Sequence, residues 1–168
     1  NSSPSEFPRI FFAPGDIQES FRVPFLAFWL SQEYQIPVII MTDKFLSESK
    51  KTVRSDSLIA PKVKWPDLIN YKKDYKRYKL TDSGISPRAL PGKGLVVANS
   101  YEHDEYGYYN DSKTGRNSQM KKRLKKIKNL EIENGVCLYG NRSADLTLVG
   151  WGSTKGVILE ALKQLDNV

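Results

Sequence analysis

The stretch RIFFAPGDIQESFRVPFLAFWLSQEYQIPVIIMTD, residues 9–43, decides the fold. It begins with an apolar run over 10–13 and ends with a second apolar run over 37–42, and both are typical of buried strands. The connection between them has room for one helix and little else, so the two strands are expected to be parallel. The stretch therefore predicts an α/β fold built on a β-α-β unit.

The helix of this unit is expected from Ile17 to about Tyr34. Asp16 and Glu19 have the spacing of a capping box at its start. Pro24 falls inside the helix and should kink it or shift its start. The helix is apolar nearly all round, which predicts that it is buried on more than one side.

A second β-α pattern ends the chain, in ADLTLVGWGSTKGVILEALKQLDNV, residues 144–168. It predicts a buried strand over 146–149 and an amphipathic helix capped by Ser153 or Thr154. The turn between them could hold a phosphate at the helix N-terminus, but it lacks the spacing of a Walker loop, and an ordinary corner is the favoured interpretation. A single β-α unit has no second strand beside it, so we expect the chain to stop partway through a domain.

Composition limits the chemistry that the chain can carry alone. Its 168 residues include one cysteine, Cys137, and one histidine, His103. One cysteine excludes an internal disulfide and cannot by itself hold an iron-sulfur cluster. One histidine argues against a His-based metal site or a catalytic triad confined to this chain. No apolar run is long enough to span a membrane, and the N-terminus is unlike an export signal.

The net charge of +7 raises the possibility of nucleic-acid binding. Much of the excess lies in 62–79 and in MKKRLKKIKN, 120–129. The second segment predicts a solvated helix with an apolar stripe of Met120, Leu124 and Ile127. A helix that binds a phosphate backbone through its lysines is the alternative. GLVVAN, 94–99, is a candidate for a third strand.

Five segments together resemble one family. The α subunits of 2-oxoacid:ferredoxin oxidoreductases, including the 2-oxoglutarate and pyruvate enzymes, have similar segments in the same order and with similar separations. The resemblance covers the chain from about Glu6 to Leu165. The segments are EFPRIFFAPGDIQESF (6–21), QIPVIIMTDKFLSES (35–49), DSGISPRALPG (82–92), NSYEHDEYGY (99–108) and ADLTLVGWGSTKGVILEAL (144–162).

The resemblance implies a domain organisation. Residues 1–50 would form the C-terminal part of the thiamine pyrimidine-binding domain. Residues 51–140 would be an interdomain connection that carries the basic amphipathic helix. Residues 141–168 would start a transketolase C-terminal-like domain, with the neighbours of its first strand beyond Val168.

The resemblance also implies cofactors and partners. The family uses thiamine diphosphate with Mg²⁺ to decarboxylate a 2-oxoacid, passes electrons through an iron-sulfur cluster to ferredoxin, and transfers the acyl group to coenzyme A. The diphosphate site and the cluster would lie on a β subunit, and the main catalytic motifs in the remaining part of the α subunit. We therefore expect the chain to be inactive alone and the enzyme to be cytoplasmic, with no membrane partner.

No catalytic residue and no metal ligand is assigned within the chain. Ser47 and Glu48 follow a strand end, where open α/β sheets place ligands, and are weak candidates for cofactor binding. Arg88 is a third weak candidate, although an ion pair that pins the connection is favoured for it. Glu102, His103 and Asp104 form a motif of unknown role, for which a structural or interface role is favoured over direct chemistry.

Two other hypotheses come from different functional classes. A basic nucleic-acid-binding module, using 121–128 and the tyrosine-rich segment, would lose affinity steeply with salt. A non-catalytic α/β interaction domain would be folded and monodisperse at this length. Neither hypothesis explains the β-α unit at the end of the chain.

Overall fold

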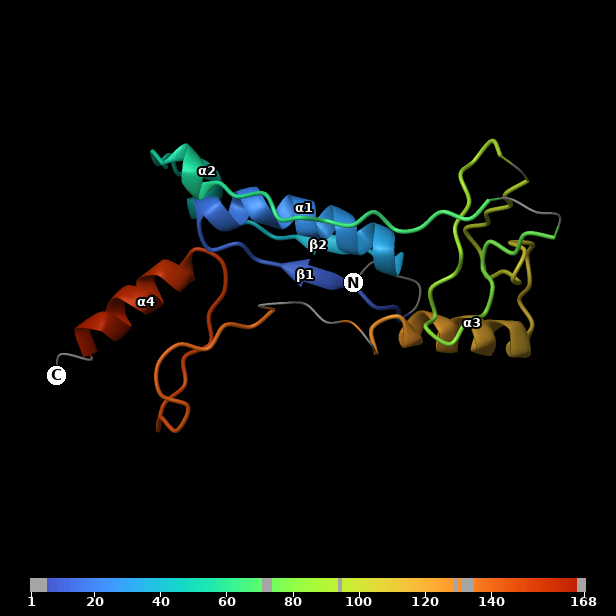
Figure 1. Ribbon diagram of the computed structural model, residues 1–168. Coiled ribbons are helices and arrows are strands. Elements are labelled where there is room, and N and C mark those ends of the chain that lie inside the picture. Colours follow the sequence, from blue (N-terminus) through green and yellow to red (C-terminus); the bar gives the residue numbers. More distant parts are fainter. Residues whose placement is uncertain (1–5, 71–73, 94, 129, 131–134, 166–168) are drawn as a thin grey trace. The chain divides into compact units, whose positions relative to one another are not determined.

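The computed structural model describes residues 6–70, 74–93, 95–128, 130 and 135–165 (Figure 1). The chain divides into two compact units, which are described separately. Unit 1 comprises Asn1–Pro8, Gln32–Ile36 and Trp65–Glu131, and unit 2 comprises Arg9–Ser31, Pro37–Lys64 and Ile132–Val168. In the part of the chain that the structure describes, no helix is both long and apolar enough to cross a membrane.

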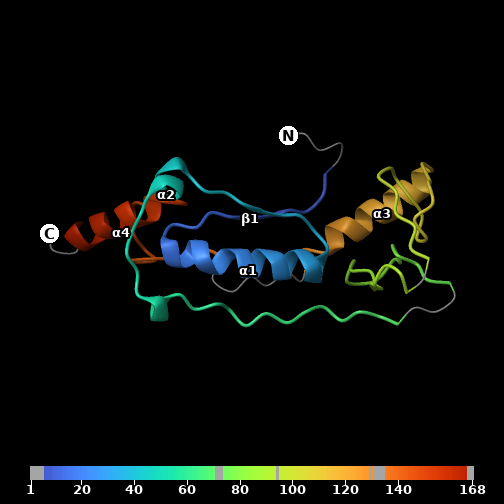
Figure 2. The same cartoon turned by 90° about the horizontal axis from the view of Figure 1, so that it is seen from above.

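Unit 2 contains the predicted β-α-β arrangement. Strands β1 (Ile10–Phe12) and β2 (Val38–Ile40) pair in parallel, with Ile10 opposite Val38 and Phe12 opposite Ile40. Helix α1 (Ile17–Tyr34) connects them and runs alongside both strands (Figures 1 and 2), although its last residues are grouped with unit 1. The α/β class and the parallel pairing are therefore confirmed.

The start of α1 also agrees with the prediction. Asp16 Oδ1 accepts a hydrogen bond from the backbone N–H of Glu19 at 2.8 Å. The Glu19 carboxylate accepts from the N–H of Gly15 at 2.7 Å, one residue earlier than in a standard capping box. The helix begins at Ile17 and runs through Pro24 without a break.

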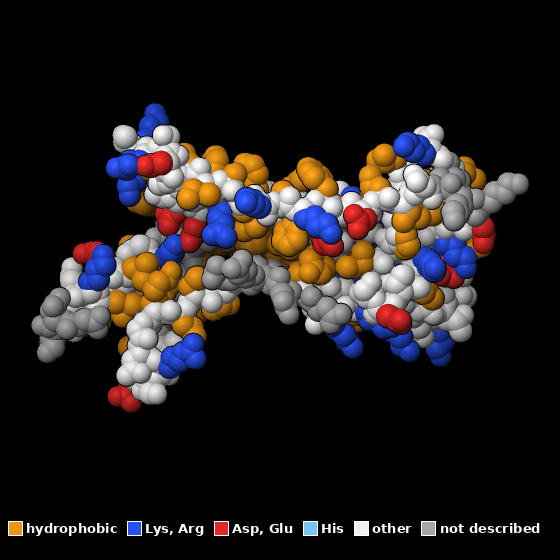
Figure 3. Space-filling model, in the orientation of Figure 1, with side chains coloured by type: hydrophobic (Ala, Val, Ile, Leu, Met, Phe, Trp, Pro, Cys, Tyr) orange, Lys and Arg blue, Asp and Glu red, His pale blue; other side chains and the backbone are white. Residues whose placement is uncertain are grey.

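The prediction that α1 is buried on more than one side is wrong in the described structure. Its buried residues are Val23, Ala27 and Leu30, which form a single stripe. Phe25 and Phe28 are 40% and 54% exposed, and hydrophobic side chains lie on the surface over α1 in Figure 3. The physical reason is that the two short strands of unit 2 cover only one face of this helix.

Two of the predicted strands do not form. Residues 146–149 are irregular, and Leu146 and Val149 are 75% and 84% exposed. Residues 95–99 also form no strand, whereas Gly94 lies outside the described residues. A strand is stabilised by a hydrogen-bonded neighbour, and in the described ranges the sheet consists of β1 and β2. Helix α4 (Thr154–Leu165), predicted after the second of these strands, is present.

Two shorter elements complete unit 2. Helix α2 (Lys44–Glu48) begins after β2, and its N-cap is Asp43, whose side chain accepts from the N–H of Leu46. A 3₁₀ helix, η1, spans Ser55–Ser57.

Helix α3 (Lys113–Lys125) is the main element of unit 1, and its orientation contradicts the prediction. Gln119 and Lys122 are buried, at 3% and 6% exposure, whereas Leu124 and Ile127 are 47% and 42% exposed. The expected apolar stripe is therefore not the packed face. The polar face of α3 is buried because the helix packs against irregular backbone, whose carbonyl groups accept hydrogen bonds from long polar side chains.

Candidate functional site

The loop that contains the Glu102–Asp104 motif is organised around one carboxylate. Asp104 Oδ1 accepts from the backbone N–H groups of Tyr106, Gly107 and Tyr108, at 2.9, 2.9 and 3.0 Å. Gly107 has a φ of 102°, and a Cβ atom there would lie 2.3 Å from the carbonyl oxygen of Val97. Only glycine therefore suits this position, and Asp104 acts as the loop's internal cap.

Glu102 fastens the same loop to helix α3. Arg123 donates from Nη1 to Glu102 Oε2 at 3.2 Å and from Nη2 to Oε1, which makes a two-point ion pair. The two side chains are 25% and 13% exposed. Burial acts to raise the pKa of Glu102, but the Arg123 guanidinium outweighs it, and the pKa lies below its usual value.

His103 is buried within this site, at 7% exposure. Its ring stacks on the ring of Tyr78, with centroids 3.8 Å apart. Its Nδ1 lies 3.1 Å from the carbonyl oxygen of Asp104. Because a carbonyl only accepts hydrogen bonds, we assign the proton to Nδ1, and Nε2 is then an acceptor. Burial lowers the pKa of His103, so the ring is neutral at pH 7.

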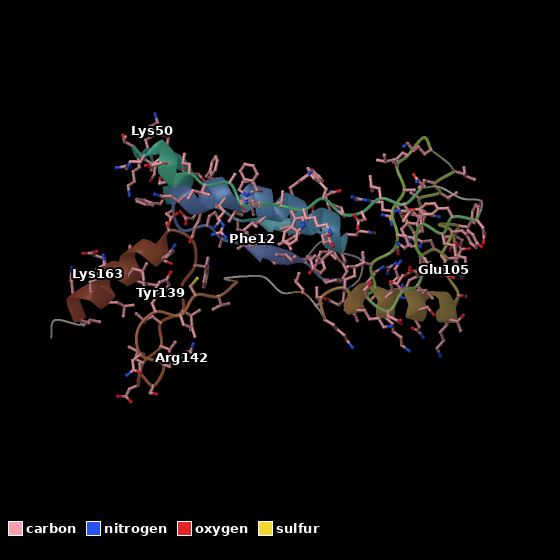
Figure 4. The ribbon with its side chains drawn as sticks, viewed as in Figure 1. Phe12, Lys50, Glu105, Tyr139, Arg142 and Lys163 are labelled. Atoms are coloured by element: carbon pink, nitrogen blue, oxygen red, sulfur yellow. The ribbon has the colours of Figure 1, made fainter. Side chains whose placement is uncertain are left out.

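An open cavity of about 350 Å³ lies between the loop and the first half of α3. Residues 103–106 line it from the loop, and Ser118 and Gln119 line it from the helix. The labelled Glu105 marks this region in Figure 4, beside α3. The motif therefore has two residues that shape the loop and one, His103, that is a buried wall of a cavity.

Two lysines, Lys122 of α3 and Lys126 directly after this helix, are bound to neutral acceptors in unit 1. Lys122 Nζ donates to the carbonyl oxygen of Tyr78 at 2.8 Å, and Lys126 Nζ donates to that of Gln35 at 2.7 Å. Arg77 Nη1 donates to Gln35 Oε1 at 3.0 Å. Burial, followed by repulsion from neighbouring cations, lowers the pKa of Lys122 to about 7 and that of Lys126 to about 8.

Arg88 lies in unit 1, but without the ion pair that the sequence favours. Its Nη1 donates to Gln32 Oε1 at 2.7 Å, and its backbone carbonyl accepts from the N–H of Ile69 at 2.9 Å. No carboxylate among the described residues lies within 4 Å of its guanidinium. Arg88 does pin the connection, through a neutral amide, and its role in cofactor binding stays a prediction.

Ser47 and Glu48 lie on the exposed helix α2 of unit 2. Ser47 Oγ donates to Thr42 Oγ1 at 2.9 Å, and Glu48 is paired with Lys44 at 4.0 Å. Neither residue lines the large groove of this unit. Their role as cofactor ligands stays a prediction.

The groove of unit 2 has a volume of about 1240 Å³ and lies at the carboxyl ends of β1 and β2. Ala13, residues 40–45 and the segment 149–154 line it, and its walls are largely apolar. The labelled Phe12 of Figure 4 marks the end of β1. Strand ends are where open α/β sheets bind ligands, which makes this groove the second candidate site.

The turn before α4 borders this groove, and carboxylates of the same chain occupy it. Asp43 Oδ2 accepts from the N–H of Ser153 at 2.8 Å. Lys155 pairs with Asp16 at 3.2 Å and also with Glu19. Burial alone would lower the pKa of Lys155, but these two carboxylates raise it to about 12. The turn is thus a structural corner, which was the interpretation favoured over phosphate binding.

Sequence reasoning missed two residues of these sites. Asp43 carries a recognisable signal, because an aspartate directly after a strand and before a helix is a typical N-cap. Gln119 carries none, because a polar helical residue is expected at the surface.

Comparisons with known proteins agree with the resemblance. The family model described as pyruvate flavodoxin/ferredoxin oxidoreductase, thiamine diP-bdg, matches residues 2–123. The chain is 38% identical over 176 residues to the 2-oxoacid:ferredoxin oxidoreductase subunit alpha of Saccharolobus solfataricus, covering 99% of the chain and 28% of that protein. It is 39% identical over 171 residues to the 2-oxoacid:ferredoxin oxidoreductase 2, subunit alpha, of Aeropyrum pernix, covering 98% and 27%.

A solved structure gives the same result. The 2-oxoglutarate:ferredoxin oxidoreductase from Magnetococcus marinus, with 2-oxoglutarate, coenzyme A and succinyl-CoA bound, is similar with a TM-score of 0.68 and 27% sequence identity, covering 95% of this chain and 29% of that one. The chain thus spans less than a third of the length of these relatives. Since the family model matches most of its residues, the chain belongs to the family of thiamine-diphosphate-binding pyruvate flavodoxin/ferredoxin oxidoreductases.

Proposed function

We propose that the chain is part of the α subunit of a 2-oxoacid:ferredoxin oxidoreductase. This enzyme oxidatively decarboxylates a 2-oxoacid to an acyl-CoA and passes the electrons to ferredoxin. The observation that carries the proposal is the 38% identity over 99% of the chain to a protein named as such a subunit. The bound 2-oxoglutarate, coenzyme A and succinyl-CoA of the similar structure support the same reaction class.

The proposal assigns each part of the chain to a domain of the α subunit. Residues 1–50 contribute to the pyrimidine-binding domain, 51–140 form the connection, and 141–168 start the transketolase C-terminal-like domain. The parallel pair β1 and β2 within the first range and the helix α3 within the second support this division. Under this proposal, the groove at the strand ends is the part of this chain that most resembles a cofactor site.

The complete enzyme would hold thiamine diphosphate, Mg²⁺ and an iron-sulfur cluster, with a β subunit supplying the diphosphate site and the cluster. Among the described residues, no three His, Cys, Asp or Glu side chains are grouped so that they could hold a metal ion. We therefore assign no metal ligand and no catalytic step to the described residues. Their proposed role is to support the strand-end groove and the 102–109 loop.

Native material tests this proposal. The polypeptide is purified from its source with whatever accompanies it, and intact mass, thiamine, iron and 2-oxoacid-dependent reduction of ferredoxin with coenzyme A are measured. A longer subunit with a cysteine-bearing partner, thiamine and iron, and turnover with 2-oxoglutarate or pyruvate, is the expected result. Purification without thiamine, iron or ferredoxin reduction contradicts the proposal. The 168-residue chain alone serves as the control and should show no turnover.

We also propose a cytoplasmic location, together with ferredoxin and the rest of the α subunit as partners. A role in nucleic-acid binding is not adopted, because Lys122 and Lys126 donate to backbone carbonyls instead of forming a free basic face. Binding of DNA or RNA that falls steeply with salt would reverse this choice.

A further inference from the structure

Three cationic side chains of unit 1, Arg77, Lys122 and Lys126, gather at two acceptor residues. Arg77 Nη1 donates to Gln35 Oε1 at 3.0 Å, and Lys126 Nζ donates to the backbone carbonyl oxygen of Gln35 at 2.7 Å. Lys122 Nζ donates to the carbonyl oxygen of Tyr78 at 2.8 Å. This nitrogen lies 5.6 Å from the centre of the Tyr78 ring, and Arg77 Cζ lies 5.2 Å from the same point. The three side chains are therefore neighbours, and we call them the cationic cluster.

No carboxylate of the described ranges balances the charge of the cationic cluster. The ion pairs with an N···O distance up to 4.0 Å in these ranges include none of its three side chains. Glu105 acts on Lys122 from a distance, but it is paired with Lys76 at 3.1 Å. Arg123, the next cation on α3, is paired with Glu102. A buried charge without a counter-charge is costly, so a bound anion would stabilise the cluster.

Gln35, which joins two of these cations, has a left-handed backbone. Its φ is 51°, a conformation that is costly for a residue other than glycine. Its side-chain Nε2 also donates to the carbonyl oxygen of Ser86 at 2.6 Å. Backbone strain of this kind persists where surrounding contacts hold it, and it is concentrated at ligand sites and active sites. The strained residue holds the Lys126 ammonium close to Arg77, which is the first of the charged groups that act on this lysine.

The cationic cluster retains hydrogen-bond donors for a ligand. An ammonium group has three N–H donors and a guanidinium has five, and each of these side chains uses one in the hydrogen bonds above. Lys122 is only 6% exposed, whereas Arg77 and Lys126 are half-buried and can be reached from solvent. A planar guanidinium beside two ammonium groups suits an anion with several oxygen atoms.

From this arrangement we propose that the cationic cluster binds one tetrahedral oxyanion with two negative charges, either free phosphate or the phosphate group of a small molecule. Two negative charges offset the repulsion among three cations better than the single charge of chloride or acetate. Three cations around one point hold one such group and do not follow a nucleic-acid backbone. The proposed site does not depend on the oxidoreductase activity.

The test is isothermal titration of the 168-residue chain with sulfate, at constant ionic strength kept with chloride. Sulfate has the same shape and charge as the phosphate dianion and does not titrate between pH 7 and 9. One sulfate should bind, with a Kd on the order of 1 mM at pH 7, and acetate should bind at least about tenfold more weakly. Competition by inorganic phosphate but not methyl phosphate would indicate the free ion, and competition by both would indicate a phosphate group. Absence of saturable sulfate binding would overturn the proposal.

Proton uptake gives a second readout that diffuse surface charge would not produce. At pH 8, Lys122, with a pKa of about 7, is mostly neutral, and Lys126, with a pKa of about 8, is half charged. A bound anion raises both pKa values, so about one proton should be taken up per sulfate, and affinity should fall as the pH rises from 7 to 9. Burial lowers the pKa of His103 below 6.5, so this ring does not titrate in the window. Titrations at pH 8 in buffers of different ionisation enthalpy measure the uptake, and a value of zero would refute the site.

Matched variants locate the binding. Lys126→Gln keeps a donor for the carbonyl oxygen of Gln35 but removes the charge, and it should weaken sulfate binding at least about tenfold. Lys126→Arg keeps the charge and should retain most of the affinity. Lys121→Gln removes the same charge from an exposed position of α3 and should change the affinity less than twofold. Equal losses in Lys126→Gln and Lys121→Gln would contradict the proposal. If Lys126→Gln does not fold, the affinity of Lys126→Arg and the proton uptake of wild type decide the question.

Discussion

Lys122 Nζ donates a hydrogen bond to the carbonyl oxygen of Tyr78 at 2.8 Å, across 44 residues of sequence. The lysine that the helical pattern places in solvent is thus a buried link between α3 and the connection. Its charge is stabilised by a neutral acceptor and opposed first by burial and then by the neighbouring cations Lys126 and Arg77.

Stability should depend on the protonation of Lys122. Its pKa is lowered to about 7, whereas a lysine in the unfolded chain titrates near about 10.4. Between these values the unfolded state binds more protons, so this residue's contribution to the free energy of unfolding rises with pH from about 7 to about 10. Thermal unfolding of wild type and Lys122→Met should be measured across this window. The Tm of wild type should rise relative to the Tm of Lys122→Met as the pH rises. Lys121→Met, at an exposed position of α3, is the control, and a difference independent of pH would contradict the prediction.

Breaking the Glu102–Arg123 pair should destabilise unit 1. Glu102→Gln leaves the guanidinium half-buried without its counter-charge, at an expected cost of about 2 kcal/mol at pH 7, between the values for exposed and buried pairs. The pKa of Glu102 is lower in the folded state than in the unfolded chain. The ion pair therefore contributes to the free energy of unfolding at pH values above the unfolded-state pKa, and this contribution is lost as the pH falls through the folded-state pKa. Urea unfolding at pH 7 and pH 3 checks this, with Glu48→Gln on exposed α2 as the control. Equal losses at the two pH values would argue against the pair as the cause.

The loop should loosen when its internal cap is removed. Asp104→Ala deletes the acceptor of three backbone N–H groups, at a cost on the order of 3 kcal/mol. Hydrogen exchange should accelerate at Tyr106, Gly107 and Tyr108 more than in α3. Asp104→Asn keeps an acceptor oxygen and should lose less. Unchanged exchange at these three amides would show that the loop holds its shape without Asp104.

Asp43 should stabilise unit 2 by capping two segments. One carboxylate oxygen accepts from Leu46 and the other from Ser153. Asp43→Ala should lower the free energy of unfolding, and Asp43→Asn, which keeps one acceptor, should lower it by less. Since these hydrogen bonds lower the pKa of Asp43, the loss should shrink at acid pH. Circular dichroism during urea unfolding is the measurement. If Asp43→Ala were as stable as wild type, the idea that Asp43 caps both segments would be refuted.

Local patterns predicted those elements that depend on short-range interactions. The start of α1 follows from Asp16 and Glu19, and the parallel pairing of β1 and β2 follows from two apolar runs joined by one helix. The strand expected over 146–149 failed because pairing depends on a neighbour that the local sequence does not reveal. The family assignment needed neither element, since it came from the order of five segments.

The candidate site was harder to predict, because its parts come from distant positions. The sequence singled out the 102–104 motif but not its long-range contacts. Glu102 pairs with Arg123, and His103 stacks on Tyr78. The buried face of α3 was also predicted wrongly, since apolar periodicity ignores a partner made of carbonyl groups. Gln119 could not be distinguished from a surface residue without the packing around it.

His103 is the only histidine of the chain, and this makes its ring a built-in spectroscopic reporter. Imidazole signals in a proton or nitrogen NMR spectrum need no assignment by mutagenesis, because every one of them arises from this loop. The nitrogen shifts distinguish the Nδ1–H tautomer from the other forms, and stacking on Tyr78 displaces the ring-proton signals through the aromatic ring current. A single spectrum of the 168-residue chain can therefore show whether the 102–109 loop is folded.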